Sequence, residues 1–143
     1  RLRSREVGSL EQVILLDTHV WIRGASDKES ISKRAASAIR RHERSGGVGI
    51  SAISLWEAAF LHRRSRIKTF EPLREWLVSL THTAGLEVHP ISLEVSLAAA
   101  SLPAAFPADP ADRLITATAI VLGCPLVTAD ERIRSANVVE TIW

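Results

Sequence analysis

A continuous apolar run that ends in an acidic residue is the feature that most constrains the fold. Val13-Ile14-Leu15-Leu16 carries no polar side chain and is followed directly by Asp17. Such a run is typical of a strand buried on both faces of a parallel sheet. An ionised carboxylate beside a core is costly unless it has hydrogen-bond donors or a cation. The run therefore predicts a buried parallel strand and marks Asp17 as a candidate functional residue, although Asp17 or Thr18 could instead cap a helix beginning near Val20.

Strands and helices are expected to alternate along the rest of the chain. Strands are predicted at 48–51, 86–89, 126–128 and 138–142, helices at 32–44, 54–61, 72–80, 93–100 and 110–122, and a short helical turn at 131–134. This alternation predicts an α/β fold, with a mainly parallel central sheet and helices on both faces. One domain is expected over residues 12–143. Residues 1–11 are expected to form a flexible N-terminal tail. No apolar segment follows Arg1 to Glu6, so this tail does not resemble a secretory signal.

Composition narrows the class of protein. The chain has 143 residues, the size of one domain, and with 46% hydrophobic and 24% charged residues it is too apolar to be disordered. Its apolar runs are far shorter than the roughly 18 residues of a membrane span. The single cysteine, Cys124, has no partner for a disulfide and is expected to be a small buried residue in a cytoplasmic protein. A net charge of +2 does not by itself predict nucleic-acid binding.

Four scattered carboxylates are expected at the same edge of the sheet. Asp17 and Asp130 each follow a predicted strand, and Glu57 lies in the first turns of the helix that leaves a third. Asp112 lies in the first turn of the helix predicted at 110–122. In parallel α/β sheets, ligands bind beyond the carboxyl ends of the strands. The four positions therefore predict one shared acidic site.

Each carboxylate also has a structural explanation. Ser54 and Glu57 have the spacing of a helix capping box. Asp109 and Asp112 flank Pro110 as a helix start would, and Asp130 could cap the turn that follows it. As a set, however, the four acidic groups would repel one another unless cations intervene. Oxygen ligands without a set of Cys or His favour magnesium or manganese, ions that activate water and stabilise charge on phosphorus.

Clusters of basic residues offer candidate contacts to a phosphate backbone. Arg63, Arg64 and Arg66 follow the helix that carries Glu57, and Arg113 lies beside Asp112. A solvated charge run is the more frequent explanation of such a cluster. The alternative is that these arginines hold a phosphate backbone near the acidic site.

Other catalytic classes have weaker support in the sequence. The five histidines show no zinc-like spacing, and Gly46-Gly47-Val48-Gly49 lacks the Lys-Ser/Thr that ends a phosphate-binding loop. An aspartyl-phosphate phosphatase would need a second carboxylate two residues after Asp17, where His19 stands. A metal-dependent nuclease remains the better interpretation.

Four motifs in a fixed order resemble those of PIN-domain ribonucleases, and most closely the VapC-type toxins of bacterial toxin–antitoxin pairs. The motifs are Leu15-Leu16-Asp17-Thr18-His19-Val20-Trp21, Ile50-Ser51-Ala52-Ile53-Ser54-Leu55-Trp56-Glu57, Asp109-Pro110-Ala111-Asp112-Arg113-Leu114-Ile115 and Leu126-Val127-Thr128-Ala129-Asp130. The resemblance covers about residues 12–143. Pro107 is a departure, because many relatives have a histidine at this place.

The resemblance implies catalytic and metal-binding roles for Asp17, Glu57, Asp112 and Asp130. It places Thr18 and Thr128 beside these carboxylates and makes Asp109 an auxiliary residue. The implied reaction is metal-dependent hydrolysis of RNA that leaves a 5′-phosphate and a 3′-hydroxyl. The implied partners are a second copy of the chain and a VapB-type antitoxin whose C-terminal tail blocks the site.

Apolar residues near the predicted acidic site are relevant to the binding of a protein partner. Trp21, Trp56, Phe60 and Leu61 are more than an acidic pocket needs. Most of them, Trp56 included, are expected in the core, and some could form a groove for a partner helix. The alternative to a nuclease is a PIN-like domain that binds RNA or protein without cleaving it.

Overall fold

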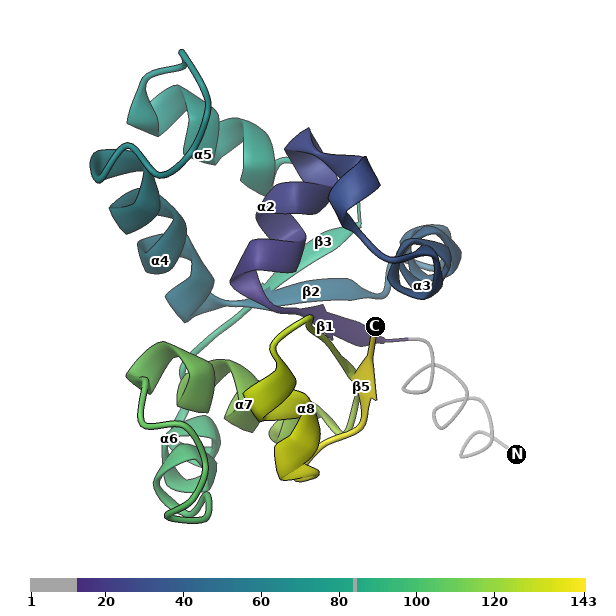
Figure 1. Cartoon of the computed structure of the whole chain (residues 1–143), viewed down its shortest axis with the longest axis vertical. Coiled ribbons are helices and arrows are strands. Elements are labelled where there is room, and N and C mark those ends of the chain that lie inside the picture. Colours follow the sequence, from purple (N-terminus) through teal and green to yellow (C-terminus); the bar gives the residue numbers. More distant parts are fainter. Residues whose placement is uncertain (1–12, 84) are drawn as a thin grey trace.

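Parallel strands in the order β3-β2-β1-β4-β5 form the central sheet (Figure 1). The computed structural model describes residues 13–83 and 85–143, so the tail expected at 1–11 lies outside the described residues. The strands are β1 (Ile14–Leu16), β2 (Val48–Ser51), β3 (Leu86–His89), β4 (Leu126–Val127) and β5 (Thr141–Ile142). In the register, Leu15 of β1 lies beside Gly49 of β2 and Leu126 of β4. The mainly parallel sheet predicted from the sequence is confirmed.

The order of the strands creates a switch point beside β1. The chain runs outward from β1 through β2 to β3, then returns and adds β4 on the other side of β1. Connections that leave β1 and β4 in opposite directions open a crevice at the carboxyl ends of the two strands, where ligands bind in such sheets. This crevice lies where Asp17 follows β1 and Asp130 comes shortly after β4.

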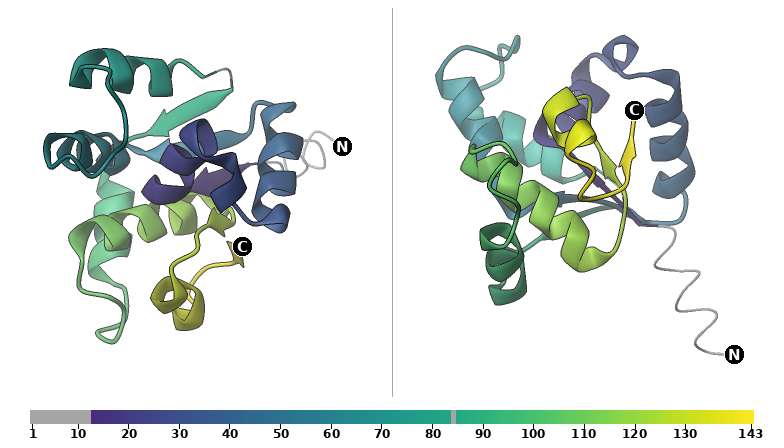
Figure 2. Two further views of the ribbon diagram at one scale, coloured as in Figure 1. Left: turned by 45° about the horizontal axis from the view of Figure 1, so that its top comes forward. Right: turned by 60° about the horizontal axis from the view of Figure 1, so that its bottom comes forward.

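Helices cover both faces of the sheet. They are α2 (Thr18–Ser26), α3 (Lys33–Glu43), α4 (Ala52–Arg63), α5 (Leu73–Thr81), α6 (Leu93–Ala100), α7 (Pro110–Leu122) and α8 (Glu131–Ala136), with the short 3₁₀ helix η1 (Lys28–Ser30) after α2. Figure 1 shows α2, α4 and α5 above β1 and α6 to α8 below it, and α3 packs with the first group at the right-hand end of the strands. The further views in Figure 2 show the same two layers.

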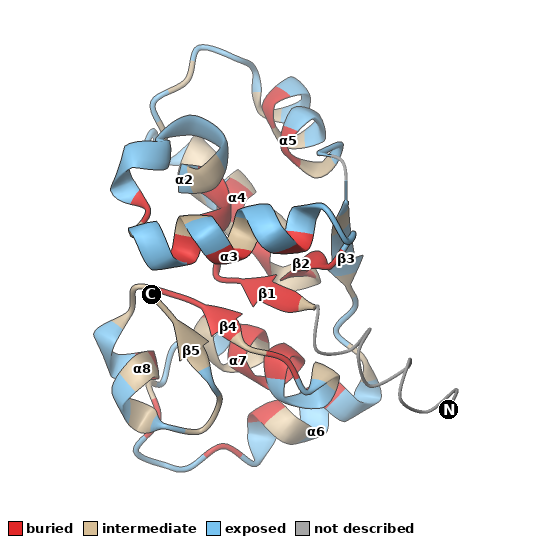
Figure 3. Ribbon diagram, turned by 90° about the vertical axis from the view of Figure 1, so that its right-hand side faces the viewer, coloured by how far each residue is buried: buried red, intermediate tan, exposed pale blue. Residues whose placement is uncertain are grey.

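The first strand joins the two cores. Ile14 and Leu16 pack into the cluster on the side of α2 to α5, whereas Leu15 packs with Ile115 of α7 and Ile133 of α8. All three residues of β1 are buried, and Figure 3 shows the buried strands β1 and β4 between the more exposed edge strands β3 and β5. The apolar run therefore forms a strand covered on both faces, as predicted.

Most predicted elements are present, and the differences lie at their ends. The predicted helix at 110–122 is observed with the same bounds. The predicted last strand shortens to two residues, and η1 was not predicted. The helix predicted from Ser54 begins at Ala52, because the side chain of Ser51 accepts a hydrogen bond from the Ile53 amide and caps it. The capping box proposed for Ser54 and Glu57 is therefore wrong.

The structure can be compared with two expectations drawn from composition, one for Cys124 and one for membrane-spanning helices. Cys124 is buried, and burial raises the pKa of its thiol to about 11, as expected for a packed, unreactive residue. None of the helices found in residues 13–83 and 85–143 combines the length and the apolar character needed to cross a bilayer.

Candidate active site

Asp17 is held at the end of β1 by a buried threonine. It occupies the N-cap position of α2, yet its side chain makes no capping hydrogen bond. Instead Thr128 Oγ1, just after β4, donates to Asp17 Oδ2 at 2.6 Å, and the same hydroxyl accepts from the Asp130 amide at 3.0 Å. Asp17 is 7% exposed. The helix-cap explanation is therefore wrong for Asp17, whose carboxylate is held at the crevice between β1 and β4.

Glu57 is held by a second threonine. Thr18 Oγ1 donates to Glu57 Oε1 at 2.5 Å and lies 2.7 Å from Ser54 Oγ, although Glu57 is 39 residues further along the chain. Thr18 and Ser54 are both fully buried. The helix α4 thus presents Glu57 towards the start of α2, one residue from Asp17. Because Thr18 directly follows Asp17, its bond to Glu57 brings these two predicted carboxylates close together.

The third acidic segment is the start of α7. Asp109 Oδ1 accepts hydrogen bonds from the amides of Ala111 at 2.8 Å and Asp112 at 3.2 Å, and Pro110 stands in the first turn. Asp109 is therefore the helix cap that its motif predicted. Asp112 is not needed for capping, so its half-buried carboxylate remains available to the site.

Asp130 has both a capping and an electrostatic role. Its Oδ1 accepts from the amides of Arg132 at 2.9 Å and Ile133 at 3.4 Å at the start of α8. The guanidinium of Arg132 lies 3.3 Å from Asp130 Oδ2 and 3.6 Å from Asp112 Oδ2. Burial alone would raise the pKa of Asp130, but hydrogen bonds from Arg132 outweigh it and lower this pKa below the ordinary value. Arg132 thus bridges the two carboxylates.

Electrostatic coupling joins all these segments into one site. Burial, followed by the negative charges of Asp109, Asp17, Asp130 and Glu57, raises the pKa of Asp112 to about 7. Burial also raises the pKa of Glu57, and the nearby charge of Asp17 adds to this shift, whereas the Thr18 hydrogen bond opposes it. Repulsion of this kind marks a place where a cation would be favourable.

The oxygen donors of the site suit a hard divalent cation, although in the described residues they are not yet gathered closely enough to hold one. The carboxylates supply oxygen ligands, the type that magnesium and manganese prefer. The threonine hydroxyls engage only Oδ2 of Asp17 and Oε1 of Glu57, so within the described residues Oδ1 and Oε2 have no protein donor. In the same residues no three Cys, His, Asp or Glu side chains already form a group that could hold a metal ion. The carboxylates would therefore have to draw closer to share one.

Arg113 points away from the acidic site. Its Nε donates to the Pro107 carbonyl at 3.0 Å, and its Nη2 donates to the carbonyls of Phe106 at 3.1 Å and Pro103 at 3.5 Å. The guanidinium also lies 5.7 Å from the centre of the Phe106 ring. Arg113 therefore fixes the loop between α6 and α7, and its donors are already used where the sequence suggested a phosphate contact.

The other predicted basic residues lie at the far end of α4. Arg63, Arg64 and Arg66 are exposed, and none of them pairs with a carboxylate among the described residues. Arg63 is six residues beyond Glu57, about 9 Å along a helix axis. The cluster therefore lies outside the acidic site.

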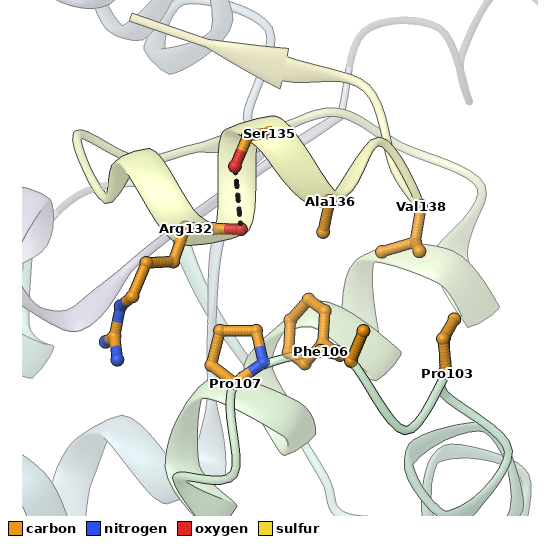
Figure 4. A pocket seen from close by; sticks show the side chains of 8 residues that line it. Pro103, Phe106, Pro107, Arg132, Ser135, Ala136 and Val138 are labelled. Atoms are coloured by element: carbon orange, nitrogen blue, oxygen red, sulfur yellow. Dashed lines mark hydrogen bonds between the residues drawn. The ribbon is translucent and has the colours of Figure 1, made fainter.

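Beside Arg132, a pocket of about 430 Å³ opens between the α6–α7 loop and α8. Figure 4 shows Phe106 and Pro107 on one side of this pocket, Ser135, Ala136 and Val138 on the other, and the Arg132 side chain at its edge. Pro107, the departure from the family pattern, is part of the pocket wall. The pocket therefore adjoins the acidic site through a residue that touches both.

The aromatic residues do not all pack as expected. Trp21 is buried in the core and Leu61 is half-buried against it, as predicted. Trp56 is 58% exposed and Phe60 is 40% exposed, so the prediction that Trp56 belongs to the core is wrong. Ser54 and Ala58 provide the buried face of α4. Trp56 lies midway between them in the sequence and therefore points to the opposite, exposed face of the helix.

Two site residues were missed from the sequence. Ser54 was assigned to a cap, and only the packing of α2 against α4 brings its hydroxyl to Thr18. Arg132 was not singled out, although its place two residues after Asp130, in the first turn of α8, was a usable signal. A cation there is positioned to meet the carboxylate that caps the same helix.

Comparison with known proteins identifies the family. The PIN domain model matches residues 14–139. Ribonuclease VapC22 of Mycobacterium tuberculosis is 40% identical over 123 residues, covering 85% of this chain and 90% of that protein. DNA-bound VapBC from Salmonella typhimurium and VapBC2 from Rickettsia felis, bound to a promoter DNA fragment, share the fold, with TM-scores of 0.67 and 0.66 at 20% and 18% identity. Each covers 90% of this chain and 96% of the solved one. The chain therefore belongs to the PIN-domain family, among the VapC-type ribonucleases.

Proposed function

We propose that this chain is a metal-dependent endoribonuclease and the toxin of a toxin–antitoxin pair. The observation that carries the proposal is the placement of Asp17, Glu57, Asp112 and Asp130 around the switch point of the sheet, where contacts of Thr18, Thr128 and Arg132 hold them. These residues come from four separate segments, and each segment is held in place by hydrogen bonds of its own. The 40% identity to a protein named as a ribonuclease supports RNA as the substrate.

The chain's own residues would hold the reacting groups in place. Thr128 and Thr18 fix one oxygen each of Asp17 and Glu57, leaving the other oxygen of each carboxylate for a magnesium or manganese ion, with Asp112 and Asp130 completing the donor set. Such an ion supplies an acidified water and stabilises charge on the phosphoryl oxygens. Hydrolysis by water breaks the bond from phosphorus to the 3′ oxygen and leaves a 5′-phosphate and a 3′-hydroxyl.

Arg132 would neutralise the acidic groups in the metal-free protein. Its guanidinium reaches Asp112 and Asp130 from an exposed position. Because the side chain is 68% exposed, it is free to move out when an ion or a substrate phosphate arrives. We propose Arg132 as a positioning residue for the phosphate, a role that suits a planar guanidinium.

The surface also supports the proposed partners. An apolar groove of about 530 Å³ between α4 and α5, lined by Leu55, Leu73, Leu77 and Val78, suits a partner helix such as that of a VapB-type antitoxin. The solved relatives from Salmonella and Rickettsia are VapBC assemblies. The exposed leucines of α6, at positions 93 and 97, suit contact with a second copy of the chain. A reducing cytoplasm is the proposed location.

RNA cleavage by the purified protein tests the central proposal. End-labelled RNA should be cut at discrete positions with magnesium or manganese and left intact with EDTA. Asp17→Asn and Glu57→Gln should abolish cutting, because each removes a charge from the site while nearly preserving the side-chain shape. Glu75→Gln, the same change at an exposed position on α5, should cut normally. RNA binding by the folded protein without cutting under any metal would favour the non-cleaving alternative.

A further inference from the structure

Two aromatic side chains of α4 and the arginine that follows the helix form a stacked column on the surface. The rings of Trp56 and Phe60 lie 5.3 Å apart at an interplanar angle of 20°, which is an offset stack. The Cζ atom of Arg64 lies 4.8 Å from the centre of the Phe60 ring, so a cation lies over this ring. We call Trp56, Phe60 and Arg64 the aromatic column. Trp56 stands at one end of this row and is the more exposed of the two rings.

The aromatic column borders the acidic site. Trp56, Phe60 and Arg64 are spaced four residues apart, which places them in one row along the helix. Trp56 directly precedes Glu57, and Phe60 lies three residues after it, on the neighbouring strip of the same helix. The groove between α4 and α5 is lined by Leu55, on the other side of Trp56 from Glu57. The column therefore faces the catalytic side of α4.

We propose that the aromatic column binds unpaired bases of the RNA substrate, with one base stacked on the outer face of Trp56. The proposal rests on the proposed nuclease function and adds a base-binding subsite beside the acidic residues. Base stacking on aromatic side chains, combined with a basic groove, is how proteins hold single-stranded nucleic acid. In a duplex the bases stack on one another and are not free to meet Trp56.

Charge favours RNA over a protein as the occupant. Arg63 and Arg66 flank the column, are exposed and pair with no acidic group of the described residues. With Arg64 they give three cations beside two exposed aromatic rings, which matches the alternation of phosphate and base along a strand. An apolar partner helix is better matched by the groove between α4 and α5, whose lining is mainly aliphatic.

Binding measurements with an abasic nucleotide test the proposal. The protein would carry Asp17→Asn so that it binds without cutting, and the probe would be a short fluorescent single-stranded RNA. Trp56→Ala should weaken binding roughly 5- to 150-fold, the loss of one stacked base, while Trp56→Phe should retain most of the affinity. Phe70→Ala, which removes a fully exposed aromatic residue in the loop after α4, should change nothing. Circular dichroism checks that each variant folds.

The abasic probe separates stacking from a general change of the surface. One position of the RNA should lose affinity for the Trp56 protein when its base is removed, and the same removal should have no further effect on Trp56→Ala. A duplex of the same sequence should bind Trp56→Ala and the parent equally.

The outcomes distinguish this proposal from the nuclease itself. Trp56-dependent binding of single strands without metal-dependent cutting would retain the aromatic column and overturn the nuclease. Normal cutting with RNA binding unaffected by Trp56→Ala would retain the nuclease and overturn the column. A loss of self-association or of antitoxin binding in Trp56→Ala, with RNA affinity unchanged, would assign the column to a protein partner and equally overturn the proposal.

Discussion

At the residue scale, the Thr128 hydroxyl connects two carboxylate segments of the site. It donates to Asp17 and accepts from the amide of Asp130, in a position with no exposure to water. Water therefore does not reach this hydroxyl. Thr116, by contrast, is a buried threonine of α7 whose hydroxyl has no partner among the described residues. The two threonines are alike in burial and differ in their hydrogen bonds, which makes them a matched pair.

Thr128→Val should destabilise the protein by about 1–3 kcal/mol, because it leaves the carboxylate of Asp17 and the Asp130 amide without a partner. Thr116→Val should be neutral or slightly stabilising, since it removes a buried polar atom that has no hydrogen bond. Urea unfolding at neutral pH measures both changes. Equal losses in the two variants would contradict the role given to the Thr128 hydroxyl.

The raised pKa of Asp112 predicts how stability depends on pH in the metal-free protein. The pKa is about 7 in the folded chain, against 3.8 for an ordinary aspartate. Between these values the folded state binds the extra proton, so the free energy of unfolding should fall as the pH rises from about 4 to 7. Unfolding in EDTA at several pH values measures this slope. Asp112→Asn should reduce it, and an unchanged slope in this variant would contradict the shift.

At the scale of secondary structure, the predicted elements were most accurate where local chemistry marked both ends. The motif of Asp109 and Pro110 marks the start of α7, and Gly123, with a φ of +66°, marks its end. At the start of α4, two serines three residues apart competed for the capping position. Ser51 caps the helix, and Ser54 instead bonds to Thr18 of another helix.

The segments that form the site could be predicted from the sequence, but the contacts between these segments could not. Asp17 and Asp130 follow strand ends, and Glu57 and Asp112 lie in the first turns of helices, a pattern that is visible in the sequence. The bond from Thr128 to Asp17 spans 111 residues, and it depends on β4 adding beside β1. The exposure of Trp56 depends on which face of α4 meets the core, and the many apolar residues of this helix leave that face ambiguous.

Arg113 gives a test of whether the loop between α6 and α7 is held by geometry or by charge. Arg113→Lys keeps the positive charge but loses the fork that reaches three carbonyls. We expect faster amide hydrogen exchange in residues 102–109 and a loss of about 1–2 kcal/mol in stability. Arg23→Lys, at the end of α2, is a control for the same exchange of side chains. Unchanged exchange in the loop would indicate that Arg113 acts through its charge instead.

At the scale of the whole molecule, exposed leucines on α6 bear on self-association. Leu93 is 70% exposed and Leu97 is 59% exposed, one turn apart on the same helix. If this surface joins two copies of the chain, Leu93→Glu should convert a dimer into a monomer, because a buried unpaired charge is strongly unfavourable. Glutamate in the first turn suits the helix, so folding should be retained.

Sedimentation or light scattering at several protein concentrations measures this change in mass. Ser37→Glu, which adds the same charge at an exposed position of α3, should leave the mass of the assembly unchanged. A dimer that persists in Leu93→Glu would move the proposed interface away from α6.

The chemistry at the cut ends tests the central claim most directly. RNA cut with magnesium in water enriched in ¹⁸O should be analysed by mass spectrometry, together with a substrate whose 2′-hydroxyl at the cut is replaced by hydrogen. Hydrolysis by water predicts a 5′-phosphate that carries one ¹⁸O atom, a 3′-hydroxyl, and cutting of the 2′-deoxy substrate. A 2′,3′-cyclic phosphate without ¹⁸O, formed equally well in EDTA and lost with the 2′-deoxy substrate, would contradict the account.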